Sequence, residues 1–250
     1  MTESVDSDLL KIAVVIGMPR AATTWLYENM NRHPGVCVSD RKEINRYLTS
    51  MSEDAYLANF AFDATHQVGL DISPAYYLCD EALRRIQSVG HKVILLIREK
   101  SEWVESLRKQ IRKQGLVEES GIYRIHIGHG DHISFDLNKY DQKSRLDFVR
   151  CLFNNILIVE YKDVDRDPVA LLSNIERFLG LESHFSEDNI IRERVNAGDA
   201  RMSSLYMSLL RLPYFDFLAR VALAVLSRRI IHWARRRFVY GYGIDRKNTM

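Results

Sequence analysis

Short runs of apolar, often β-branched residues alternate along the chain with segments of helical periodicity. The runs predict strands at 12–16, 36–38, 68–72, 92–97 and 156–161. The helical segments predict helices near 23–32, 80–88, 101–113, 141–152 and 167–179. Continuously apolar strands that alternate with helices are typical of a parallel sheet covered on both faces. The pattern therefore predicts a three-layer α/β fold with a central parallel sheet flanked by helices.

Two regions depart from this alternation. Residues 114–140 are rich in Gly, His and Asp, and we expect them to form a long functional loop. Residues 200–237 are predicted to be mostly helical, with a break at Pro213. We therefore expect a main domain over residues 1–198 and a helical extension over 199–250, packed on or beside it.

Composition and charge narrow the class of protein. The 250 residues are 46% hydrophobic, which suits a sizeable domain with a real core. The sequence has no signal-like N-terminus and no apolar run of membrane-spanning length. The three cysteines, Cys37, Cys79 and Cys151, fit no metal spacing and no disulfide framework. We therefore expect a cytoplasmic protein.

The C-terminal extension has a different charge from the rest. Residues 201–250 contain ten Lys or Arg and two acids, so they carry +8, whereas the whole chain carries +2. Within 217–238 apolar residues lie between the arginines, which suits an anionic membrane surface or an acidic carrier. Alternatively, the apolar side closes over the sheet and the arginines are solvated. No pattern specific for nucleic acid is present.

The first predicted strand runs into a short loop and then a helix, which is a ready site for an anion. Backbone N–H groups at the start of a helix are unpaired, and Arg20, Thr23 and Thr24 add a charge and two hydroxyls. An ordinary strand-to-helix turn also favours these residue types. The nucleoside-triphosphate pattern G-x-x-x-x-G-K-[ST] fits at Gly17 and Thr24, but Ala22 and Thr23 replace its second glycine and its lysine. Cleavage of ATP or GTP is therefore disfavoured.

The segment GMPRAATTWLYENMNRHPGV resembles the 5′-phosphosulfate loop of sulfotransferases. The matching positions are Gly17, Pro19, Arg20, Thr23, Thr24, Leu26, His33, Pro34 and Val36. Ala22 departs from the usual glycine, and its methyl group narrows the approach of a sulfonate to the backbone. A distant second match is Arg98 and Ser106, at the spacing of the motif that grips the 3′-phosphate of the donor. Here Lys100 replaces the usual proline, and residues 92–110 alone would also suit an ordinary strand and helix.

Weaker matches extend this resemblance over about residues 12–198. They are 70-LDISPAYYL-78, the late strand and helix over 156–181, and the K-E stretch in 42-KEINRY-47. The sequence is most similar to the bacterial and carbohydrate-type branch, and it lacks the histidine motif of the phenol and steroid branch. The resemblance implies a P-loop-like fold.

The resemblance also implies a reaction and its donor. Sulfotransferases transfer a sulfonate group from 3′-phosphoadenosine 5′-phosphosulfate (PAPS) to an acceptor, here a hydroxyl of a carbohydrate or a small natural product, and release 3′-phosphoadenosine 5′-phosphate (PAP) without a metal. The residues implied to bind the donor are Pro19, Arg20, Ala21, Ala22, Thr23, Thr24, Trp25, Arg98, Ser106 and Arg201.

Three carboxylate or imidazole side chains are candidates for the general base. Glu43 matches the glutamate of the K-E stretch and follows the second strand, although it could instead pair with a surface arginine. Asp71 could orient Glu43 or replace it, and His66 is a third candidate. Arg20 is expected to stabilise the departing phosphate by charge, because it cannot act as an acid.

Other interpretations stay open at this point. His126, His129 and His132 recur every three residues, which is compatible with a zinc site or with an acceptor-binding loop. A nucleoside-phosphate kinase with an aberrant loop would need an acid for Mg²⁺, and Glu160 is the candidate. A non-catalytic nucleotide-binding protein is the third interpretation, supported by Ala22 and by Ile72 in place of the family's lysine.

Overall fold

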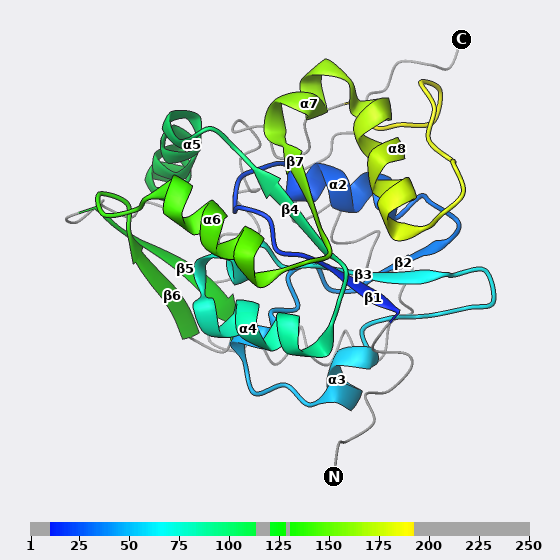
Figure 1. The fold of residues 1–250 in the computed structure, drawn as a ribbon, viewed down its shortest axis with the longest axis horizontal. Helices are drawn as coiled ribbons and strands as arrows, with labels where there is room; N and C mark the ends of the chain where they lie inside the picture. The colour runs from blue at the N-terminus through cyan, green and yellow to red at the C-terminus, as the bar shows by residue number, and fades with distance from the viewer. Residues whose placement is uncertain (1–10, 114–120, 129–130, 193–250) are drawn as a thin grey trace, which may run out of the picture. The chain divides into compact units, whose positions relative to one another are not determined.

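A parallel sheet of five strands in the order β2-β3-β1-β4-β7 organises the chain in this computed structural model, which describes residues 11–113, 121–128 and 131–192. Its strands are β1 (Ile12–Val15), β2 (Val36–Val38), β3 (Val68–Ile72), β4 (Val93–Ile97) and β7 (Ile156–Glu160). All the strand pairs in this sheet are parallel. The predicted strands and the predicted parallel sheet are confirmed (Figure 1).

Helices lie on both faces of the sheet, as predicted. Figure 1 shows α2 and α8 over one face and α4 and α6 over the other. The longer helices are α2 (Thr23–Met30), α4 (Asp80–Val89), α5 (Lys100–Lys113), α6 (Gln142–Leu152) and α8 (Pro168–Leu179). Short elements that the sequence pattern did not predict are η1 (Arg46–Leu48), α3 (Glu53–Leu57), η2 (Pro74–Leu78) and α7 (Tyr161–Arg166).

Local chemistry explains where the helices begin and end. The carboxylate of Asp167 accepts a hydrogen bond from the N–H of Ala170 and caps α8, whose first residue is Pro168. Asp141 caps α6 in the same way. At the other end of α8, Gly180 takes the left-handed conformation with φ 83°, which glycine adopts without steric cost.

The register of the strands brings three loops to one rim of the sheet. Val15 pairs with Ile72 on β3, and the N–H of Ile16 bonds the carbonyl of Ile94 on β4. The loops after β1 and β3 therefore start at the same level, and β4 continues to Ile97 beside the loop after β1. The chain leaves β1 toward β2 and leaves β4 toward β7, so the strand order reverses at the pair β1–β4, where open α/β sheets bind ligands.

Gly17 lets the loop after β1 lie directly against β4. A Cβ atom at this position would lie 2.8 Å from the backbone nitrogen of Leu96. The N–H of the next residue, Met18, donates to the carbonyl of Leu96 at 2.8 Å. Glycine is therefore needed here for the close approach of two backbones.

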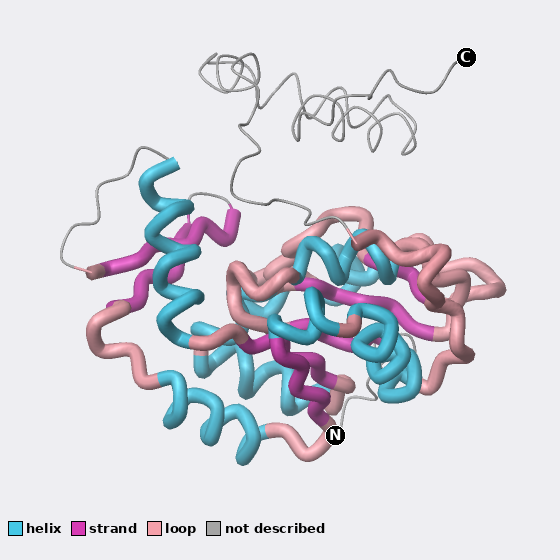
Figure 2. Tube along the Cα trace, turned by 90° about the horizontal axis from the view of Figure 1, so that it is seen from above, coloured by secondary structure: helices cyan, strands magenta, loops and turns pink. Residues whose placement is uncertain are grey.

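Part of the region expected to be a long loop is a β-hairpin, which corrects the prediction for 114–140. β5 (Ile122–Gly128) and β6 (Asp131–Asp136) pair antiparallel, with Tyr123 opposite Phe135. Tyr123 and Ile127 alternate with an exposed Arg124, so one face of β5 is buried against the domain. Figure 2 shows the hairpin beside α5.

The predicted extension over 199–250 lies outside the described residues, so its helices and the domain boundary stay predictions. Within the described ranges, no helix has the length and apolar character needed to cross a membrane.

Replacing Gly17 with alanine tests the close approach of the loop to β4. Because the added methyl group meets backbone atoms of Leu96 that cannot rotate away, we expect a loss of stability of about 1–3 kcal/mol. The measurement is the free energy of unfolding in urea. An unchanged midpoint would show that the loop does not lie against β4 as described.

Candidate functional site

The loop between β1 and α2 leads directly into the backbone N–H groups of a helix start. Ala22 precedes α2 in a left-handed conformation with φ 65°, and no side chain caps the helix. The first turn of α2 contains no acidic residue. An anion bound here would therefore meet a positive helix end and would not have to displace a carboxylate.

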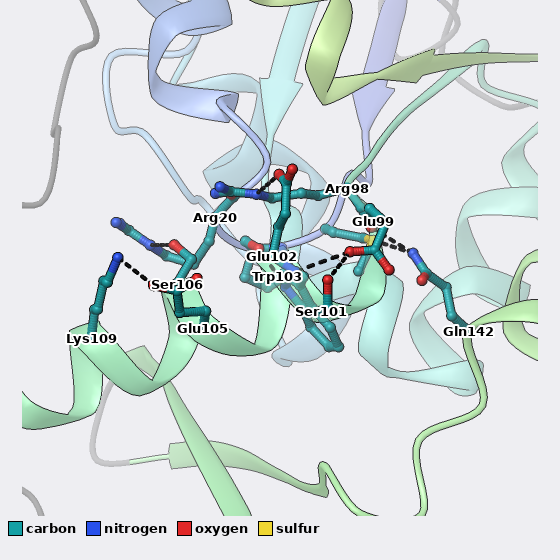
Figure 3. Close-up of polar contacts among 12 residues, drawn as sticks. Arg20, Arg98, Glu99, Ser101, Glu102, Trp103, Glu105, Ser106, Lys109 and Gln142 are labelled. Carbon is teal, nitrogen blue, oxygen red and sulfur yellow. Dashed lines mark hydrogen bonds and ion pairs between the residues drawn. The ribbon is translucent and has the colours of Figure 1, made fainter.

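Three of the cationic and hydroxyl groups predicted for the donor site converge on this loop. The Nε of Arg20 donates to the Oγ of Ser106 at 3.3 Å, and the Nη1 of Arg98 donates to the carbonyl of Arg20 at 3.2 Å (Figure 3). Arg20 comes from the loop after β1, Arg98 follows β4, and Ser106 lies on α5. The structure thus brings together residues that are 86 positions apart.

Arg98 is held by groups on three elements. Its Nε lies 3.2 Å from the carboxylate of Glu102, and its guanidinium stacks 4.0 Å from the ring centroid of Tyr161. Its backbone carbonyl accepts from Gln142 at 2.6 Å. A guanidinium fixed in this way is ready to bind a phosphate at little cost in side-chain entropy.

Other predicted donor-binding residues are mostly buried. Ala21 and Thr23 are buried, so their contribution to an anion site would come from the backbone. Trp25 is also buried, and its Nε1 donates to the carbonyl of Ile191 at 2.5 Å. Asn29 binds the N–H of Ile191 as well, so α2 anchors the segment that leads toward the C-terminal part of the chain. Arg201 lies outside the described residues.

Glu43 lies at the same rim, beside the end of β3. Its N–H donates to the carbonyl of Ile72 at 3.1 Å, and its side chain is 40% exposed. Its backbone has φ 62°, a left-handed conformation that is uncommon outside glycine and is costly for a residue with a Cβ atom. The carboxylate pairs with Lys42 at 2.8 Å, and no arginine among the described residues forms an ion pair with it.

Asp71 lies in the interior of the domain and affects the rim only through the residues that it bonds. It is fully buried and accepts hydrogen bonds from Ser73 at 2.7 Å, Tyr76 at 3.0 Å and Tyr56 at 3.1 Å. Burial raises the pKa of this carboxyl, and the hydroxyl donors oppose the rise.

The Oγ of Ser73 in turn accepts from the N–H of Asn45 at 3.1 Å. Asp71 therefore fixes the backbone two residues beyond Glu43. Of its two predicted roles, orienting Glu43 suits this geometry, because a carboxylate without exposed surface cannot meet an acceptor.

The structure separates His66 from the other candidates. The residue precedes β3, whereas Glu43 lies beside the last residue of that strand, so the two are at opposite ends of the sheet. The Nδ1 of His66 accepts from the N–H of Asp63 at 3.0 Å in a surface turn. His66 is therefore not a base at this rim.

The predicted histidine pattern falls partly on described residues. His126 and His132 are register partners in the hairpin, and His129 lies outside the described residues. In the part of the chain that the structure describes, no group of His, Cys, Asp and Glu is arranged to hold a metal.

Sequence reasoning did not consider Tyr123, a buried residue of β5 whose hydroxyl donates to the side chain of Gln110 at 3.1 Å. Burial raises the pKa of its hydroxyl to about 12, the positive charge of Arg20 lowers it, and the negative charge of Glu43 raises it. The hydroxyl therefore lies within electrostatic range of the two side chains. The sequence carried no signal for this residue, because its partner Gln110 is on α5 and its strand was expected to be a loop.

Comparisons with known proteins give a fold and distant relatives. No family model matches the chain. Heparan sulfate glucosamine 3-O-sulfotransferase 5 of Mus musculus and of Homo sapiens are each 23% identical over 198 residues, or 71% of this chain and 56% of the relative. The chain thus spans little more than half the length of these curated relatives.

A solved structure carries the same architecture. The sulfotransferase of Alicyclobacillus acidocaldarius aligns with a TM-score of 0.53 at 14% identity, over 72% of this chain and 85% of that chain. The described part of this chain therefore has the P-loop-like α/β fold of sulfotransferases. The resemblance drawn from the sequence is confirmed at this level.

Replacing Arg98 with alanine tests the predicted 3′-phosphate contact. Because one charge-assisted hydrogen-bonding group is removed, we expect PAP binding to weaken by about 1.5–3 kcal/mol. Calorimetric titration with PAP measures the change, and Arg85→Ala, which removes an exposed ion pair on α4, is the control. Unchanged affinity in a folded Arg98→Ala protein would contradict the assignment.

Replacing Ala22 with glycine, the usual residue of the sulfotransferase motif that this loop resembles, tests the strain in the loop. An alanine in the left-handed region costs about 1–2 kcal/mol, and glycine itself costs about 0.5–1 kcal/mol in chain entropy. We therefore expect Ala22→Gly to stabilise the protein by roughly 0.5–1 kcal/mol. Thermal unfolding measures the shift, and a lower midpoint would contradict the assigned left-handed conformation.

Proposed function

We propose that this protein is an enzyme that transfers a sulfonate group from PAPS to a hydroxyl group of an acceptor. The observation that carries the proposal is the convergence of Arg20, Arg98 and Ser106 at the uncapped start of α2. Glu43 adds a carboxylate at the adjacent part of the rim. The sulfotransferase fold supports the same conclusion.

The chemistry follows from these positions. The N–H groups at the start of α2 and the guanidinium of Arg20 would hold the 5′-phosphosulfate and stabilise the charge that develops on the departing phosphate oxygen. The bond between sulfur and that oxygen breaks as the acceptor oxygen attacks in line. Glu43 takes the proton of the acceptor hydroxyl, and Arg98 and Ser106 would hold the 3′-phosphate.

The alternative enzymes fit the site less well. A kinase would need the lysine that Thr23 replaces, and its candidate Mg²⁺ ligand, Glu160, pairs with Lys162 at the end of β7. A protein that binds the nucleotide without turnover would keep the same loop. Labelled-sulfate turnover separates this third possibility from the proposed transferase.

The acceptor and the cellular setting are part of the proposal. The curated relatives are named for heparan sulfate glucosamine, which supports a carbohydrate acceptor, and a small natural product is the alternative. We also propose a cytoplasmic location, with the basic segment 217–238 binding an anionic membrane surface or an acidic carrier. That segment lies outside the described residues.

A thermal-shift panel tests the proposed donor. We expect PAP to raise the unfolding temperature without Mg²⁺, because backbone N–H groups and arginines replace the metal, and we expect ATP to act weakly. Transfer of labelled sulfonate from PAPS to components of a lysate then tests turnover. Stabilisation by ATP with Mg²⁺ but not by PAP would overturn the proposal.

Replacing Glu43 with glutamine tests the proposed base. The variant keeps the shape of the side chain but cannot accept the proton, so kcat should fall by about 10²–10⁴ while PAP affinity barely changes. Initial rates of PAP release at saturating PAPS measure kcat. An active Glu43→Gln enzyme would show that another group takes the proton.

A further inference from the structure

Trp103 is a buried side chain of α5 that contacts the loop between β1 and α2. Its indole has no exposed surface and one polar group, the Nε1–H. This N–H donates to the carbonyl of Pro19 at 2.8 Å (Figure 3). Because the ring is fully buried, the N–H cannot turn to water instead. The Pro19 carbonyl is therefore held on the side of α5.

Aromatic rings keep the indole in this orientation. Phe135 of β6 stacks on Trp103 with centroids 5.8 Å apart and 12° between the ring planes. Tyr140, in the segment after β6, packs against the same ring with centroids 4.7 Å apart. Aromatic pairs at these separations attract one another beyond the burial of their surface. The direction of the indole N–H is thus fixed before any ligand binds.

The bond to Pro19 sets the direction of the next N–H group in the loop. The peptide between Pro19 and Arg20 is trans and planar, so its C=O and its N–H point in opposite directions. With the carbonyl held toward α5, the N–H of Arg20 points away from that helix. The carbonyl of Arg20 itself accepts from Arg98 at 3.2 Å. Trp103 and Arg98 therefore hold the two peptide planes on either side of the Arg20 Cα atom.

Arg20 needs this support because its backbone conformation is costly. It has φ 67°, in the left-handed region that residues with a Cβ atom avoid. Such a conformation persists only where the surroundings fix it. Ser106, three residues after Trp103 and on the same face of α5, accepts from the Nε of Arg20 at 3.3 Å. One helix thus holds the backbone of Arg20 through Trp103 and its side chain through Ser106.

We propose that Trp103 is a positioning residue for the 5′-phosphosulfate of the donor, because its indole N–H keeps the backbone N–H and the guanidinium of Arg20 in the arrangement that binds this group. The inference rests on the proposed function, in which Arg20 holds the 5′-phosphosulfate. Trp103 does not touch the donor and acts only through the loop. Its contribution therefore concerns ligands that carry a 5′-phosphate.

Three adenosine nucleotides separate this role from a structural one. PAP carries both phosphates, adenosine 3′-monophosphate lacks the 5′-phosphate, and adenosine 5′-monophosphate lacks the 3′-phosphate. Calorimetric titrations give the gain in affinity from the 5′-phosphate as the Kd for adenosine 3′-monophosphate divided by the Kd for PAP. The same ratio with adenosine 5′-monophosphate gives the gain from the 3′-phosphate.

Trp103→Phe keeps an aromatic ring but removes the N–H. We expect it to reduce the gain from the 5′-phosphate about three- to tenfold, the worth of one hydrogen bond. The affinity for adenosine 3′-monophosphate should stay within about twofold, because this nucleotide has no phosphate at the loop and loses no hydrogen bond there. A role confined to packing would instead change the affinities for both nucleotides together.

Matched variants complete the test. Tyr140→Phe removes one hydrogen-bonding group from the same aromatic cluster, the hydroxyl that donates to Tyr77 at 3.1 Å, but keeps the ring that packs on Trp103. It should leave the gain from the 5′-phosphate unchanged. If Trp103→Phe does not fold, 3-benzothienylalanine at position 103 takes its place, because it keeps the shape of the indole with sulfur instead of N–H. The expected result is the same.

An unchanged gain from the 5′-phosphate in Trp103→Phe overturns the inference, whether the individual affinities stay the same or fall together. An equal reduction in Tyr140→Phe also overturns it, because loss of the indole N–H would then not be the cause. If wild type does not bind PAP, or binds it no better than adenosine 3′-monophosphate, the proposed function itself fails. That result is distinct from a wild type that gains affinity from the 5′-phosphate beside a Trp103→Phe protein that keeps the whole gain.

Discussion

The site depends on how the backbone of residues 17–22 is held before any ligand arrives. β4 bonds the N–H of Met18, and Trp103 on α5 donates its indole N–H to the carbonyl of Pro19 at 2.8 Å. Arg98 donates to the carbonyl of Arg20. The loop carbonyls are thus turned toward β4 and α5. This pre-ordering matters because a phosphate-binding loop that had to be fixed on binding would lose affinity to backbone entropy.

A network of buried hydroxyl groups supports the segment that carries Glu43. Asp71 accepts hydrogen bonds from the hydroxyls of Tyr56, Tyr76 and Ser73, and nearby His91 accepts one from Tyr47. Burial lowers the pKa of His91 to about 4, so the imidazole is neutral at physiological pH. Each of these hydroxyl groups has a hydrogen-bond partner, and a satisfied network of this kind is rigid. It supports the left-handed backbone of Glu43 and Asn45, which would otherwise relax.

The sequence predicted the sheet, the main helices and the anion loop, because each depends on local patterns. Apolar runs mark the strands. Arg98 and Ser106, which their spacing in the sequence assigned to one site, both contact Arg20 in the structure. The hairpin could not be predicted, since Gly, His and Asp near its turn hid the alternation of Tyr123 and Ile127.

Other errors arose from long-range packing. The burial of Asp71 comes from tyrosines on other segments, and the distance of His66 from the rim follows from the direction of β3. The resemblance supplied the roles of Arg20 and Glu43, and the fold placed both residues at one rim.

The ion pair between Arg98 and Glu102 has a consequence for the choice of nucleotide. Glu102 occupies the guanidinium as an internal counter-ion, and more than half of its side chain is exposed, so the pair is weak. A 3′-phosphate, which carries more charge than a carboxylate, could replace Glu102 as the partner of Arg98, and Glu102 would then be solvated. A nucleotide without a 3′-phosphate could not replace Glu102, so the ion pair would remain. In the proposed function the carboxylate would disfavour nucleotides that lack a 3′-phosphate, such as ATP, by competition and not by steric exclusion.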